Sequence, residues 1–92
     1  MPYQLSELGH VDQGKVVEIS LNYAASIKVM DTTNYYSFKK GGKYKYIGEY
    51  VDKSPYQITI PYPARWYVVL ELDGLAAKVA SSVKILPSSA LK

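Results

Sequence analysis

The chain has 92 residues, of which 48% are hydrophobic and 21% charged, with a formal net charge of +3 and no cysteine. This length predicts one domain with one modest core, and the lack of cysteine excludes disulfides, thiolate metal sites and cysteine nucleophiles. No apolar run approaches the roughly 18 residues of a membrane helix, and the start lacks a signal-peptide pattern. We therefore expect a soluble, cytoplasmic protein.

Alternation of apolar and polar residues recurs along the chain and is typical of strands with one better-buried face. The predicted strands cover 15–21, 26–31, 44–50, 56–62 and 66–72. Turn-forming residues lie between them, notably at Lys53-Ser54-Pro55, at 61–64 and at Asp73-Gly74. The apolar faces predict a core that contains Ile27, Val29, Ile58, Ile60, Trp66, Val68 and Leu70.

Two segments fit more than one structure. Between Asp31 and Gly41, one or two helical turns fit the sequence, because Asp31 or Thr32 can cap a helix start and Gly41 can supply a left-handed exit. The segment 75–86 fits both a helical stripe and a strand face, and its β-branched residues near the end favour a strand. We assign residues 1–86 to a single domain and 87–92 to a flexible C-terminal tail.

The segment 38–56 carries all of the excess positive charge. Its five lysines face two acids, and the six positive and six negative side chains elsewhere cancel. Lysines interleaved with tyrosines can bind single-stranded nucleic acid, with phosphates on ammonium groups and bases on rings. Alternation nevertheless places Lys45 on the strand face opposite Tyr44 and Tyr46, and lysines on an exposed edge strand also prevent edge-to-edge pairing. A solvated hairpin is therefore favoured over a nucleic-acid site.

Catalytic and metal-binding motifs are missing. His10 is the single histidine, and the acids are scattered singly. Asp31-x-x-Asn34 lacks the spacing of a calcium loop and favours a turn in which short side chains satisfy backbone amides. Gly41-Gly42-Lys43 lacks the remaining residues of a phosphate-binding loop. We predict no enzyme activity, no metal site and no cofactor.

Several strings in the chain resemble a bacterial family of small all-β domains, domain of unknown function eighteen-eighty-three. The motif Met-Asp-x-x-Asn-Tyr at 30–35 carries most of the resemblance. It is followed in order by Gly42, Tyr44-x-Tyr46, Ser54-Pro55 and Trp66-Tyr67-Val68-Val69, so that the resemblance covers about residues 8–86.

The resemblance implies a single β-domain that occurs alone or joined to a TIR domain, with no established activity. This chain departs from the family pattern at two places. It has Gly48-Glu49 where members tend to have two glycines, and Pro63-Ala64-Arg65 where they tend to have a glycine-containing turn and a histidine before the tryptophan. A ligand that contacts the second glycine or the histidine in other members would lack that contact here.

These observations predict an all-β fold, a single antiparallel β-sandwich or flattened barrel with a jelly-roll-like order. We expect seven or eight short strands and at most one short helical turn. The function that we favour is a non-catalytic recognition module for a protein or small-molecule ligand. Two alternatives stay open, namely nucleic-acid or polyanion binding through 39–45 and a homo-oligomer with a tyrosine-rich interface.

Candidate residues divide into two groups. Those expected to contact a ligand or partner are Tyr35, Tyr36, Lys39, Lys40, Lys43, Tyr44, Tyr46 and Arg65. Those expected to be structural are Asp31, Asn34, Gly42, Pro55 and Trp66.

Overall fold

A computed structural model describes residues 3–22, 24–71 and 81–86. Within these ranges the chain forms seven strands and one short helix. Their bounds are β1 Tyr3–Val11, β2 Val16–Leu21, β3 Ala25–Asp31, α1 Thr32–Lys39, β4 Tyr50–Val51, β5 Tyr56–Thr59, β6 Ala64–Glu71 and β7 Ser81–Leu86.

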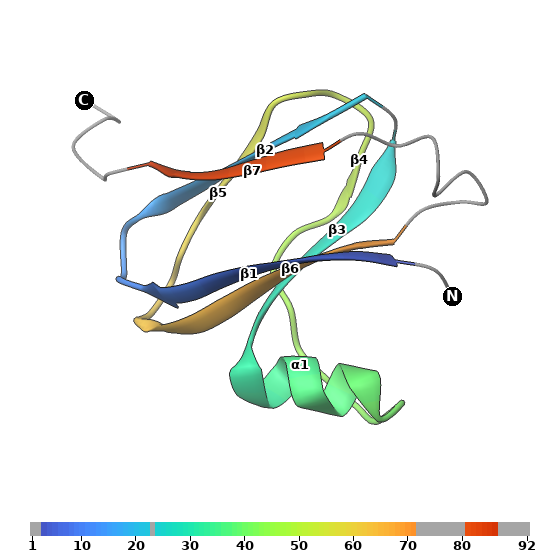
Figure 1. The fold of residues 1–92 in the computed structure, drawn as a ribbon, viewed down its shortest axis with the longest axis vertical. Helices are drawn as coiled ribbons and strands as arrows, with labels where there is room; N and C mark the ends of the chain where they lie inside the picture. Colours follow the sequence, from blue (N-terminus) through green and yellow to red (C-terminus); the bar gives the residue numbers. More distant parts are fainter. Residues whose placement is uncertain (1–2, 23, 72–80, 87–92) are drawn as a thin grey trace.

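The strands form two antiparallel sheets that face each other, and the helix lies outside one of them (Figure 1). The four-stranded sheet has the order β1-β6-β3-β4, and the three-stranded sheet has the order β5-β2-β7. Strand β1 pairs with β6, β2 with β5 and β3 with β4. This nested pairing is that of a jelly roll, so the predicted all-β sandwich with a jelly-roll-like order is confirmed.

The main core fills the space between the two sheets. Trp66, Val68 and Leu70 of β6 pack there with Ile27 and Val29 of β3. Each of these side chains is at most 3% exposed. From the other predicted face, Ile60 is fully buried and Ile58 is half-buried. The core assignment made from period-two alternation is therefore confirmed, with Ile58 at its margin.

Helix α1 covers the outer face of the four-stranded sheet and creates a second small core. Tyr35 of the helix stacks on Tyr67 of β6, with ring centroids 4.5 Å apart, beside Met30 and Val69. The helix starts after Asp31, whose carboxylate accepts a hydrogen bond from the Asn34 backbone N–H. It is followed by Gly41 at a φ of +79°. The helix has eight residues, about two turns. This is the longer of the two lengths that the cap residues allowed, and it exceeds the one short helical turn expected for the fold as a whole.

The predicted strand 44–50 is broken, which corrects the sequence-based interpretation. Residues 44–46 are irregular, Ile47 forms an isolated bridge to Val29, and regular pairing resumes only at Tyr50. The break lies at Gly48, which has a φ of +124°, and a Cβ there would overlap the carbonyl oxygen of Ile27. This edge chain follows β3 closely enough that only glycine fits.

Strand β1 is present in the structure, but the alternation of apolar and polar residues did not predict it. Its pairing with β6 shifts register between Glu7 and Gly9, and Gly9 has a φ of +71°. A β-bulge of this kind interrupts the period of two in the sequence. For the ambiguous segment 75–86, the strand interpretation is confirmed at Ser81–Leu86. Residues 72–80, with the predicted turn at Asp73-Gly74, and the predicted tail 87–92 lie outside the described residues.

Candidate ligand-binding cleft

A cleft of about 280 Å³ opens where the end of β3, the start of α1, the 40–49 loop (the residues between α1 and β4) and the turn before β6 meet. These four segments are far apart in the sequence and are brought together by the pairing of β3 with β6 and with the loop. Its lining residues are Val29, Asp31, Asn34, Lys45, Tyr46, Ile47, Pro61, Tyr62 and Trp66. An apolar cavity with a few convergent polar groups is the usual form of a small-ligand site, and this volume is close to its lower limit of about 300 Å³.

Asp31 is the acidic group of the cleft. One carboxylate oxygen, Oδ1, accepts from the Asn34 backbone N–H at 3.0 Å and from its side-chain amide at 2.9 Å. The other oxygen, Oδ2, accepts from the Tyr62 hydroxyl at 2.5 Å. A carboxylate has about four lone-pair sites, so one stays free for a ligand donor.

The hydrogen bonds around Asp31 determine the ionisation of the cleft. Burial works against the charged carboxylate, but the bonds from Tyr62 and Asn34 outweigh it and lower the pKa of Asp31. The bond to Asp31, together with burial, raises the pKa of Tyr62 to about 12. At neutral pH the cleft therefore contains a stable carboxylate and a neutral phenol.

Aromatic rings form much of the wall. Tyr46 and Tyr62 are 47% and 42% exposed. The Tyr62 ring contacts the Trp66 ring at a centroid distance of 4.9 Å. Trp66 is itself only 3% exposed, and its indole Nε1–H donates to the Tyr62 carbonyl at 3.1 Å. The indole anchors the Tyr62 segment to the core while its edge lines the cleft.

Lys28 holds the Tyr46 side of the cleft in place. From the outer face of β3, its ammonium group donates to the Tyr44 hydroxyl at 2.7 Å and pairs with Glu71 at 2.5 Å. It also lies 5.1 Å from the ring centroids of both Tyr44 and Tyr46. Burial opposes the charge on Lys28, but the bonds to Glu71 and Tyr44 outweigh that effect and raise its pKa. A permanently charged ammonium thus orders two tyrosines of an otherwise irregular loop.

A second hollow adjoins the cleft along the helix. It is lined by Asn34, Gly42, Lys43, Tyr44 and Lys45, so that it shares Asn34 and Lys45 with the cleft. The Asn34 side-chain oxygen accepts from the Lys45 backbone N–H at 2.8 Å, and the Lys43 carbonyl accepts from the Ser37 hydroxyl. Both bonds tie the loop to α1, and the helix thereby positions the two lysines.

The structure separates the residues predicted to contact a ligand. Tyr44 and Lys43 line the second hollow, and Tyr46 lines the cleft. Tyr35 is 5% exposed and belongs to the second core, so the prediction that it contacts a ligand is corrected. Its ring is taken up by the stack on Tyr67 that seats the helix.

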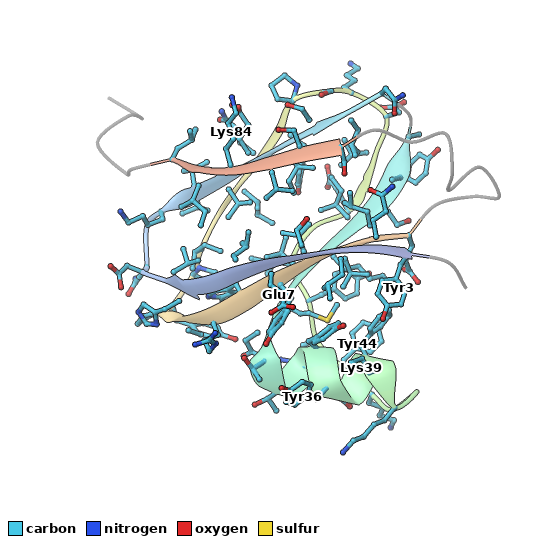
Figure 2. The ribbon with its side chains drawn as sticks, viewed as in Figure 1. Tyr3, Glu7, Tyr36, Lys39, Tyr44 and Lys84 are labelled. Atoms are coloured by element: carbon cyan, nitrogen blue, oxygen red, sulfur yellow. The ribbon has the colours of Figure 1, made fainter. Side chains whose placement is uncertain are left out.

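The remaining predicted contact residues lie outside the cleft. The Lys39 ammonium lies over the rings of Tyr35 and Tyr36, 5.5 and 5.7 Å from their centroids. Figure 2 shows Tyr36 and Lys39 on the helix, with Tyr44 close to it. Lys40 and Arg65 are exposed. Among the lysines of 39–45, Lys43 and Lys45 line the second hollow, whereas the ammonium group of Lys39 lies over the two helix tyrosines.

The predicted structural residues occupy supporting positions. Asp31 and Asn34 connect β3, α1 and the loop, as described above, and Trp66 is core. At Gly42 a Cβ would come within 2.9 Å of the Ser37 hydroxyl oxygen. Pro55 is exposed, in the turn where the Ser54 hydroxyl accepts from the Leu21 backbone N–H.

Tyr62 is the main residue of the cleft that sequence reasoning missed as a site residue. The sequence does mark this residue, since it stands between Pro61 and Pro63 directly before β6. Prolines fix the backbone φ on both sides of Tyr62 and keep this segment out of a central strand. Its partner Asp31 was recognised as a cap, but nothing in the sequence links the two.

Two kinds of feature are absent from the part of the chain that the structure describes. No three His, Asp or Glu side chains there come together as metal ligands. No helix in those residues is long and apolar enough to cross a membrane.

Comparison with known proteins gives one match. The family model described as Domain of unknown function (DUF1883) matches residues 1–89. Neither the curated proteins nor the solved structures contain a significant match.

Proposed function

The chain belongs to the DUF1883 family, and we propose that it is a non-catalytic recognition module whose cleft binds a small molecule containing a ring. The observation that carries this proposal is the wall of the cleft, where the exposed rings of Tyr46 and Tyr62 stand beside a carboxylate that keeps a free lone pair. Aromatic faces take up planar or sugar rings, and a carboxylate selects ligands that donate hydrogen bonds.

The ionisation of the cleft supports binding over catalysis. Acid–base catalysts work best when their pKa lies near the operating pH. Here the pKa of Asp31 is lowered and that of Tyr62 is raised to about 12, so both move away from neutrality. Groups of this kind hold fixed hydrogen bonds and exchange protons poorly.

Two further features belong to the proposal. The first is an association with TIR domains, which the family resemblance motivates. The second is a cytoplasmic location, which is the expectation from the sequence. An effector domain needs a neighbour that senses or assembles, and a small-molecule cleft supplies a sensing function. A protein ligand that inserts a single side chain into the cleft is compatible with the same geometry.

The test is a ligand-observed NMR screen with uncharged ring compounds, namely adenosine, indole and a methyl glucoside. We expect at least one to bind the wild type, to lose binding in Tyr62→Ala and to keep it in Tyr50→Ala. Tyr50 is the matched control, because it is 59% exposed and does not line the cleft. If no compound binds, or if both variants behave alike, the cleft is not the recognition site.

A further inference from the structure

The cleft and the second hollow adjoin each other and differ in polarity, and we call the two together the depression. They share Asn34 and Lys45, which stand at the boundary. Beyond that boundary, one side holds the Asp31 carboxylate with Tyr46 and Tyr62, and the other holds Lys43 with Tyr44 and the Gly42 backbone.

The polar groups at the boundary can reach a bound molecule. The Asn34 amide nitrogen has two N–H donors, one of which is used on Asp31. The Lys45 backbone N–H is satisfied by Asn34, so its ammonium group is the part of this residue available to a ligand. Lys43 and Lys45 have exposed side chains and no ion pair in the described part of the chain.

We infer that the depression binds a nucleoside monophosphate, with its ring in the cleft and its phosphate on Lys43 and Lys45. This inference rests on the proposed function of the cleft and names the class of ligand. The base or sugar contributes a ring for the tyrosines and N–H or O–H donors for Asp31. The phosphate contributes the negative charge that two ammonium groups attract.

The same polarity excludes simpler ligands. Inorganic phosphate has no ring and leaves the Asp31 side of the depression unused. A long single strand needs a row of cations, and the ammonium group of Lys39 is held over the helix tyrosines. A ligand with one phosphate and one ring matches the two ammonium groups of Lys43 and Lys45 and the single apolar cleft.

Calorimetric titration at low salt tests the inference with four probes, AMP, adenosine, inorganic phosphate and a ten-nucleotide thymidine single strand. The test variant is Lys43→Glu/Lys45→Glu. The control is Lys39→Glu/Lys40→Glu, which changes the net charge equally but alters neither the cleft nor the second hollow. We expect AMP to bind the wild type about tenfold more tightly than adenosine, from two charge-assisted contacts at exposed lysines. In the test variant AMP falls to the affinity of adenosine, and in the control most of the advantage remains.

Each other outcome overturns the inference in a distinct way. Equal binding of AMP and adenosine removes the phosphate subsite and leaves the proposed cleft standing. An equal loss in both variants shows a general charge effect, and phosphate binding as strong as AMP binding shows that the ring plays no part. A single strand that binds far more tightly than AMP, with both variants weakened, replaces the inference by polyanion binding. If neither AMP nor adenosine binds, the inference fails, and the cleft is then judged by indole and the glucoside.

Discussion

Replacing Asp31 by alanine removes the group that joins three segments of the chain. The carboxylate caps α1, accepts from the Asn34 side chain and accepts from the Tyr62 hydroxyl. Loss of a helix cap costs about 1 kcal/mol. The Tyr62 hydroxyl is on an exposed residue where water can replace the lost bond, so it adds less than a full charged hydrogen bond.

We therefore expect Asp31→Ala to lower the free energy of unfolding by about 2 kcal/mol. In a domain of this size that corresponds to a fall in Tm of roughly 10 °C. The assay is urea unfolding followed by Trp66 fluorescence, with Asp12→Ala as the control. Asp12 is also acidic, and its side chain bonds to exposed His10, so loss of that side chain costs less than about 0.5 kcal/mol.

The stability of Asp31→Asn should lie between those of Asp31→Ala and Asp12→Ala, because asparagine is also a good helix cap but lacks the charge. If Asp31→Ala is no less stable than Asp12→Ala, the three bonds do not hold the segments of the cleft together.

The remaining predictions concern the supports of the cleft. Gly48→Ala should be at least 2 kcal/mol less stable than wild type, since the added Cβ clashes with Ile27 at a φ that is already unfavourable. Gly41→Ala has open space around the added Cβ and should lose only about 1 kcal/mol of stability. Equal losses in urea unfolding would contradict the close approach of the loop to β3. Lys28→Met leaves Glu71 without its ion-pair partner and should lower the free energy of unfolding by about 2 kcal/mol. Adding Glu71→Gln to the same chain should recover part of that loss in a double-mutant cycle. Additive losses would show that the two residues are not coupled. The free energy of unfolding of wild type should exceed that of Tyr62→Phe by its largest amount between about pH 4 and 10. It should be lost as the pH falls below 3.8 toward the lowered pKa of Asp31, because protonation weakens the bond. It should also be lost as the pH rises from 10 through about 12, where Tyr62 ionises; a difference that does not depend on pH would argue against the Asp31–Tyr62 bond.

The sandwich was predictable because its evidence is local. Period two in 66–72 and 26–31 identified residues that the structure buries between the sheets, and the cap residues at Asp31 and Gly41 identified α1. A bulge or a positive φ interrupts the period of two at Gly9 and Gly48. Alternation therefore did not predict β1, and it predicted 44–50 as one continuous strand.

The cleft could be predicted only in fragments. Asp31 and Tyr46 were both singled out, as a structural residue and a contact residue, but their shared cavity depends on Tyr62 and on the pairing of β3 with β6. The favoured separation of Lys45 from the tyrosines assumed a regular strand, and the irregular loop brings Lys45 and Tyr46 to the same cavity. Such contacts follow from tertiary pairing, which alternation within one segment does not report.

If the cleft between Asp31, Tyr46 and Tyr62 is the binding site, the indole N–H of Trp66 reports on binding directly. The chain has one tryptophan, so a ¹H–¹⁵N spectrum contains a single indole signal, which comes from the group bonded to the Tyr62 carbonyl. In a titration with AMP or with any ring compound that binds, we expect this signal and the backbone amides of Lys45 and Tyr62 to shift together. Binding that moves the amide signals of β2, β5 and β7 while the indole signal stays fixed would place the site on the other sheet, away from the cleft.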